Sequence, residues 1–128
     1  MKFWDASAII PLVVREPTTT VVEKLLADDG EITAWWGTIL ECLSAVARRE
    51  RSGEATHIET SRMLERLARL QTDWQEIAPT NEVRSSAQRL LRVHPLRSAD
   101  ALQLAAAKAV SGSSPELWQF VSFDTRLR

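Results

Sequence analysis

Four carboxylates in the sequence, Asp5, Glu41, Asp100 and Asp124, stand where an apolar segment ends or a helix is expected to begin. In an open parallel α/β fold, the carboxyl ends of the strands share one edge of the sheet, and ligands bind at that edge. We therefore expect the four acids to converge there. Their mutual repulsion would be costly without a cation. The pattern predicts a site for a divalent metal, Mg²⁺ or Mn²⁺, since both prefer oxygen ligands.

Each acid taken singly has a simpler interpretation, because helix starts favour carboxylates. Glu41 stands three residues after Thr38, the spacing of a capping box, and capping and metal binding are equally well supported for it. Asp5 and Asp124 are each placed to cap a helix. Asp100 belongs to the first turn of an otherwise apolar helix, where an acid requires a reason beyond solubility.

Apolar segments alternate with helical patterns along the whole chain. We expect strands at residues 2–5, 32–36, 74–78 and 117–123, and helices at residues 8–15, 18–28, 38–51, 54–72, 80–93 and 98–110. The helices at 38–51 and 54–72 should form a hairpin, and the last strand is apolar enough to be buried on both faces. This alternation predicts one α/β domain over residues 1–128, with a parallel sheet covered by helices on both sides.

Composition excludes several classes of protein. The 128 residues carry a net charge of −1, which excludes a globally basic nucleic-acid binder, although Arg48, Arg49 and Arg51 could contact phosphate or simply be solvated. No stretch is suited to span a bilayer or to act as a signal peptide, so we expect a cytoplasmic protein. The single cysteine, Cys42, excludes an internal disulfide, and only two histidines, far apart in sequence, argue against zinc.

Four segments carry a family resemblance in their order and spacing. They are Phe3–Ala8, Leu40–Ala45, His94–Ala105 and Val121–Leu127, of which the third is the most specific. Together they resemble the PIN-domain ribonucleases, especially the VapC-like toxins of type II toxin–antitoxin pairs. The resemblance covers essentially the whole chain.

The resemblance implies a three-layer α/β/α sandwich with a central, mainly parallel sheet. Because the family usually continues past the last acidic motif, we expect the final helix and edge strand to be missing from a chain that stops at Arg128. The implied activity is that of a Mg²⁺- or Mn²⁺-dependent endoribonuclease that uses the four acids, with Ser7 and Ser122 as polar neighbours. The implied partners are RNA, a second copy of the chain and a small cognate antitoxin.

Within the quartet, we expect Asp5 and Asp100 to be the central metal ligands, Glu41 to hold a water or act as a base, and Asp124 to complete the site. The alternative is a non-catalytic PIN-like module that binds RNA or protein. A haloacid-dehalogenase-like phosphatase is a poor match, because Ser7 stands where that class would have a second Asp.

Five tryptophans exceed what a core of this size readily absorbs, and alternation along a strand sends Trp35 and Trp36 to opposite faces. We therefore expect a homodimer with at least one Trp at an interface.

The early helices suggest where an antitoxin would dock. We expect its amphipathic segment in an apolar groove near Ile9, Leu12, Val13, Met63 and Leu67, with an Arg or Lys that reaches toward the acids. For any one of these apolar residues, a place in the ordinary core is the better-supported alternative.

Overall fold

The sheet consists of four short strands, all of them parallel. In the computed structural model, which describes residues 1–124, they are β1 (Lys2–Trp4), β2 (Thr33–Trp35), β3 (Gln75–Ile77) and β4 (Gln119–Val121). Their order across the sheet is β3-β2-β1-β4. Phe3 of β1 lies opposite Thr33 of β2 on one side and Phe120 of β4 on the other. The chain thus steps outward from β1 to β3 and then returns to the other side of β1.

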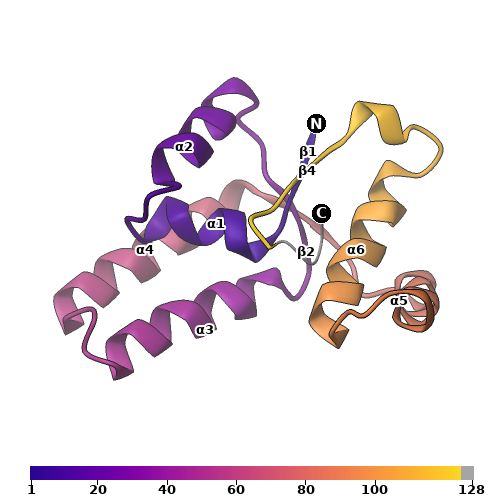
Figure 1. Cartoon of the computed structure of the whole chain (residues 1–128). Helices are drawn as coiled ribbons and strands as arrows, with labels where there is room; N and C mark the ends of the chain where they lie inside the picture. Colours follow the sequence, from indigo (N-terminus) through magenta and orange to yellow (C-terminus); the bar gives the residue numbers. More distant parts are fainter. Residues whose placement is uncertain (125–128) are drawn as a thin grey trace.

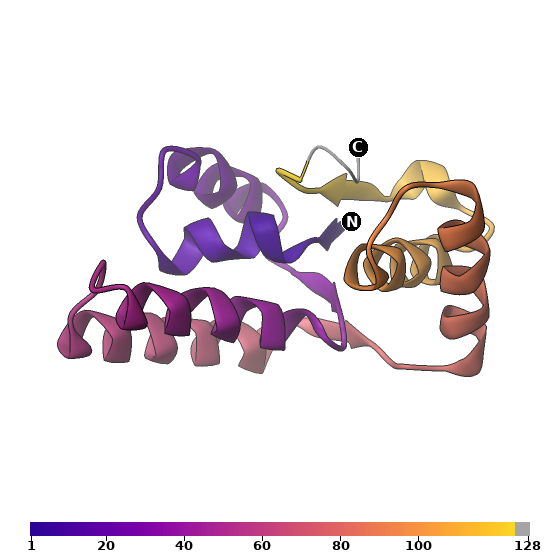
Figure 2. The ribbon, with the colours of Figure 1, turned by 60° about the horizontal axis from the view of Figure 1, so that its bottom comes forward.

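Six α-helices and one short 3₁₀ helix connect and cover these strands. They are α1 (Ala6–Val13), α2 (Thr19–Asp28), α3 (Thr38–Arg51), α4 (His57–Asp73), α5 (Asn81–Val93), α6 (Ser98–Ser111) and η1 (Pro115–Leu117). Helices α3 and α4 lie side by side as the expected hairpin, which Figure 2 shows along its length. No helix within residues 1–124 has the length and apolar character needed to cross a membrane.

The helices form two layers, one on each face of the sheet (Figure 1). Consecutive side chains of a strand point to opposite faces, and the two aromatic residues of β1 lie in different cores. Trp4 packs with residues of α1 to α4, such as Ile9 and Leu67, whereas Phe3 packs with residues of α5 and α6, such as Val83 and Ala105. The predicted α/β/α sandwich with a parallel sheet is confirmed.

Local signals explain where the helices begin. Asp5 caps α1 by accepting from the Ser7 amide, so this helix begins at Ala6, earlier than its apolar pattern predicts. Thr56 and Glu59 form a capping box that sets the start of α4 at His57, later than predicted.

The last strand is shorter than predicted and only partly buried, with Gln119 exposed. The expectation of burial on both faces was wrong, because β4 is an edge of the sheet that the described residues form.

Three of the five tryptophans, Trp4, Trp35 and Trp74, are buried in the core, and Trp36 is 52% exposed. The predicted divergence of Trp35 and Trp36 is therefore observed.

The prediction of an apolar docking groove was wrong in its residues. Ile9, Leu12, Val13 and Leu67 are buried within the domain, and Met63 is partly buried against them, because α1 packs directly on α2, α3 and α4.

Candidate active site

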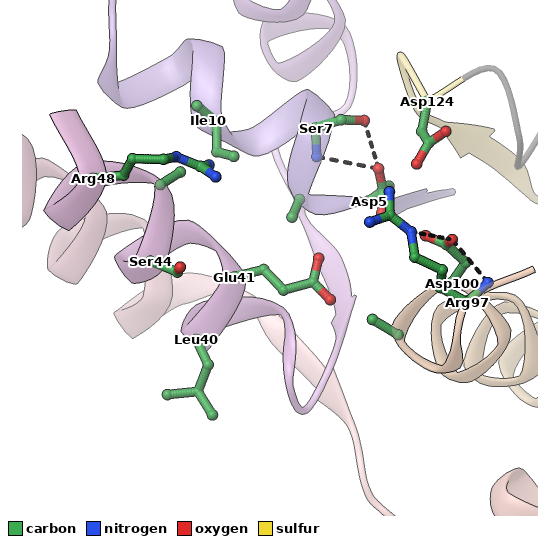
Figure 3. Close-up of a pocket in the computed structure, with 13 residues that line it drawn as sticks. Asp5, Ser7, Ile10, Leu40, Glu41, Ser44, Arg48, Arg97, Asp100 and Asp124 are labelled. Atoms are coloured by element: carbon green, nitrogen blue, oxygen red, sulfur yellow. Dashed lines mark hydrogen bonds and ion pairs between the residues drawn. The ribbon is translucent and has the colours of Figure 1, made fainter. Parts of the chain in front are cut away.

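The four predicted acids line one pocket of ≈ 530 Å³. Figure 3 shows their carboxylates facing it from four elements: the end of β1, the first turns of α3 and α6, and the segment after β4. The chain crosses from one side of β1 to the other between β3 and β4. The pocket therefore lies at a topological switch point, where open α/β sheets bind their ligands.

Asp5 is buried and held by three hydrogen bonds, all to its Oδ2 atom. The donors are the Ser7 amide at 3.1 Å, the Ser7 hydroxyl and the Ser122 hydroxyl at 3.2 Å. The capping role and the pocket position thus coincide in one residue. With Oδ2 engaged by these donors, Oδ1 is the oxygen that the arrangement leaves for a ligand.

Ser7 and Ser122 join the end of β4 to the start of α1, as the resemblance implied for polar neighbours of the acids. Their hydroxyl oxygens lie 3.3 Å apart. The Phe123 amide donates to Ser7 Oγ at 2.9 Å, and the Asp124 amide donates to Ser122 Oγ at 3.0 Å. These bonds fix the backbone that carries Asp124. The last three residues of the resembling segment, 125–127, lie outside the described residues.

Asp100 is buried in the first turn of α6, as predicted. Its Oδ2 accepts from the Arg97 backbone amide at 3.3 Å and lies 4.0 Å from the Arg97 Nε atom. The carboxylate therefore satisfies a backbone donor at the helix start, where the helix dipole also favours a negative charge. As with Asp5, a local structural role and a place in the pocket belong to the same side chain.

Glu41 does not form a capping box with Thr38, so that alternative was wrong. The N-cap of α3 is Gly37, no side chain caps this helix, and Thr38 is its first residue. Glu41 Oε2 instead accepts from Gln103 Nε2 at 3.0 Å.

Glu41 also has an unusual pKa. Burial and the charges of Asp5, Asp100 and Asp124 raise the pKa of Glu41 from 4.5 to about 7, although the hydrogen bond from Gln103 opposes this rise. Burial and the other three acids therefore disfavour the ionised form of Glu41. A carboxyl group that titrates near neutral pH is also suited to proton transfer.

The sequence patterns did not identify three further residues as members of the site. Gln103 is fully buried and contacts Glu41, while Arg48 and Arg97 line the pocket. Spacing could have indicated two of them. Gln103 follows Asp100 by three residues and Arg48 follows Glu41 by seven, which places each pair on one face of its helix.

The donor set of the pocket consists of carboxylate oxygens, the ligands that Mg²⁺ and Mn²⁺ take. In the part of the chain that the structure describes, however, no three His, Cys, Asp or Glu side chains are grouped so that they could hold a metal ion. Asp5 is tied to the two serines and Glu41 to Gln103. The chemistry of the set still fits a divalent cation that retains several waters, because then not every acid has to touch the ion.

Comparison with known families identifies one match, the PIN domain, over residues 2–128. No curated protein matches the chain. PIN domains are generally nucleases and typically use divalent metals. With its four acids at the switch point of a parallel sheet, the chain belongs to the PIN domain family.

Proposed function

We propose that this PIN domain is a Mg²⁺- or Mn²⁺-dependent endoribonuclease. The observation that carries the proposal is the meeting of four acids from four elements at one pocket, where their charges and burial raise the pKa of Glu41 to about 7. Acids gathered in this way destabilise the metal-free protein, and a bound cation would relieve that repulsion.

Asp5 and Asp100 are the proposed direct ligands, and Glu41 and Asp124 would act through water or complete the set. Asp5 offers Oδ1, because its Oδ2 accepts three hydrogen bonds. When bound, a divalent cation lowers the pKa of the attacking water and neutralises charge on the phosphoryl oxygens.

The side chains of the pocket then divide the remaining work. Glu41 Oε1 takes a proton from the water whose oxygen attacks phosphorus, since Oε2 is engaged by Gln103. The bond from phosphorus to the leaving ribose oxygen breaks, and that oxygen takes a proton from solvent. Arg48 of α3 and Arg97, the N-cap residue of α6, line the pocket and bind phosphates of the RNA strand.

The further proposal is that the domain acts as the toxin of a toxin–antitoxin pair. Beside the acids, the pocket is lined by Ile10 and by Leu40, which is 62% exposed. An inhibitor with an apolar segment on these residues and an Arg directed at Asp5 and Asp100 would block the site. Co-expression with the product of the neighbouring gene should give a complex that no longer cleaves RNA. A complex as active as the free chain would contradict this mode of control.

A non-catalytic binding module is the second candidate. It is favoured by the finding that, within residues 1–124, no three acids are grouped to hold a metal ion. The two candidates differ in turnover, which a cleavage assay measures directly.

The decisive experiment is incubation of the purified chain with RNA, and with DNA of the same sequence, in the presence of Mg²⁺, Mn²⁺ or EDTA. We expect cleavage of RNA only with metal. Asp5→Asn and Asp100→Asn should each reduce it by about 100-fold or more, since each removes a proposed ligand. Asp28→Asn changes an exposed acid at the end of α2 and is the matched control. Unchanged cleavage by folded Asp5→Asn and Asp100→Asn would refute the assignment.

A further inference from the structure

Gln103 is a fully buried amide, 1% exposed, between two residues of another helix. It lies on α6, and its side chain bridges to Thr38 and Glu41, both on α3. The Thr38 hydroxyl donates to Gln103 Oε1 at 3.2 Å, and Gln103 Nε2 donates to Glu41 Oε2 at 3.0 Å. Thr38 is fully buried as well. The three side chains thus form a continuous chain of hydrogen bonds that ends at the pocket.

The polarity of this chain has a physical cause. When Glu41 is ionised, its carboxylate can only accept hydrogen bonds, and the amide accordingly presents its NH₂ group to Glu41. The amide oxygen then faces Thr38, and the hydroxyl is the donor it requires. Because Thr38 and Gln103 are buried, water cannot replace either bond, and an unmade bond would leave a buried polar group without a partner.

The bridge also joins the two helical layers. Helix α3 belongs to the layer on the Trp4 face of the sheet, and α6 packs against β2 and belongs to the layer on the Phe3 face. The contact between Gln103 and Glu41 therefore crosses from one layer to the other at the carboxyl edge of the sheet, where the acids meet. A long, flexible Glu side chain gains a fixed position there that its own helix does not supply.

We propose that Gln103, held in one orientation by Thr38, is a positioning residue that aims Glu41 at the metal and the substrate. The bond to Oε2 holds the carboxylate so that Oε1 faces the pocket. This inference rests on the proposed function, because it gives the bridge a role in that same site. A purely structural brace between the layers would affect stability alone.

Four variants separate these roles. Gln103→Leu removes both hydrogen bonds at nearly constant size, Thr38→Val removes the hydroxyl, Thr38→Ser retains it, and the fourth combines Gln103→Leu with Thr38→Val. The readouts are the Kd for Mn²⁺ of the free protein by calorimetry, kcat and KM for RNA cleavage, and the urea midpoint of unfolding.

We expect Gln103→Leu to weaken Mn²⁺ binding and lower kcat by about 10-fold each, because Glu41 completes the metal site directly or through water and also accepts the proton of the attacking water. The KM for RNA should change little. Thr38→Val should act in the same direction and Thr38→Ser should restore near wild-type values. The double variant should be no worse than Gln103→Leu, because Thr38 acts through Gln103.

Several outcomes would overturn the proposal. One is a folded Gln103→Leu chain with unchanged Mn²⁺ affinity and kcat and a lower urea midpoint, which indicates a structural brace. Another is full additivity of the two substitutions. If Gln103→Leu fails to fold, the comparison of Thr38→Val with Thr38→Ser decides the question. A wild-type chain that binds Mn²⁺ without cleaving RNA would refute only the proposed function, and the Mn²⁺ affinities would still decide the role of Gln103. A chain that binds no Mn²⁺ would refute both.

Discussion

Glu41 carries a charge that the folded protein disfavours at neutral pH. Its pKa is raised from 4.5 to about 7, first by burial and then by the neighbouring acids. Below pH 4.5 the group is protonated in both the folded and the unfolded chain and has no effect on stability. Between pH 4.5 and about 7, the unfolded chain loses this proton while the folded chain retains it, so the free energy of unfolding falls across this range and stays lower above it.

Glu41→Gln should therefore stabilise the metal-free protein at pH 8 but not at pH 4.5. Because Glu41 is only partly buried, solvent screening reduces the expected gain to about 1 kcal/mol. The measurement is the urea midpoint in EDTA at both pH values. Glu65→Gln, at an exposed position of α4, is the control and should show no such gain. Equal stability of wild type and Glu41→Gln at pH 8 would mean that burial and the neighbouring acids do not disfavour the Glu41 charge as inferred.

Arg48 is the residue whose charge we expect the RNA backbone to use. It lines the pocket and takes part in no ion pair with any residue in the described part of the chain. Arg48→Ala should weaken RNA binding about equally for all sequences. It should also reduce the slope of log K against log salt concentration by about 1, the effect of losing one phosphate contact. Arg51→Ala is the matched control, since Arg51 is exposed at the end of the same helix and does not line the pocket. Equal losses for both variants would indicate only a general charge effect.

At the scale of elements, the connection from β2 to α3 aims Glu41, and it depends on Gly37. A Cβ atom built on Gly37 would lie 2.6 Å from the Nε1 atom of Trp35, a buried side chain. Since buried aromatic rings have little room to move, the close approach requires glycine. The first turn of α3, with Thr38 and Glu41, is positioned by this contact.

Gly37→Ala should destabilise the protein by about 1–3 kcal/mol, the usual effect of overpacking a core. Gly30→Ala serves as the control, because a Cβ there would meet no atom within 4 Å, and its effect should stay within about 0.5 kcal/mol. Denaturation in urea with an unchanged m-value measures both. If the two variants have the same midpoint, Trp35 must move aside at little cost.

The sequence predicts this fold well where one pattern dominates. The order of strands and helices follows from apolar periodicity, and the position of the acids follows from the shared carboxyl edge of parallel strands. Contacts between distant residues were harder to predict. Glu41 with Thr38 has the spacing of a capping box, but Gly37 occupies the cap position and both side chains turn to Gln103. Nothing local distinguishes such a cross-layer contact from a cap.

The same limit explains the groove and the edge strand. An apolar residue such as Leu12 has the same pattern whether it lines a docking groove or fills the core, and only the packing of α1 on three helices decides. The last strand is as apolar as a central one, yet it has only β1 as a neighbour in the described sheet. Burial depends on which elements lie next to each other, which periodicity alone does not specify.

At the scale of the whole molecule, the segment around the start of α3 retains exposed apolar side chains. Leu40 and Leu43 are exposed on the first two turns of α3, and Trp36 is exposed in the turn just before this helix. Leu40 also lines the acidic pocket. We propose that a second copy of the chain covers this surface, which would place the dimer contact beside the site.

Trp36→Ser should then raise the dissociation constant of the dimer by about 30-fold, the effect of losing about 2 kcal/mol at an aromatic hot spot. Ile58→Ser is the control, because Ile58 is 65% exposed in the first turn of α4, which follows the C-terminal end of α3, whereas Trp36 precedes the N-terminal end of α3. Sedimentation velocity across micromolar concentrations measures both. A monomeric wild-type chain, or a Trp36→Ser dimer with an unchanged dissociation constant, would exclude this surface.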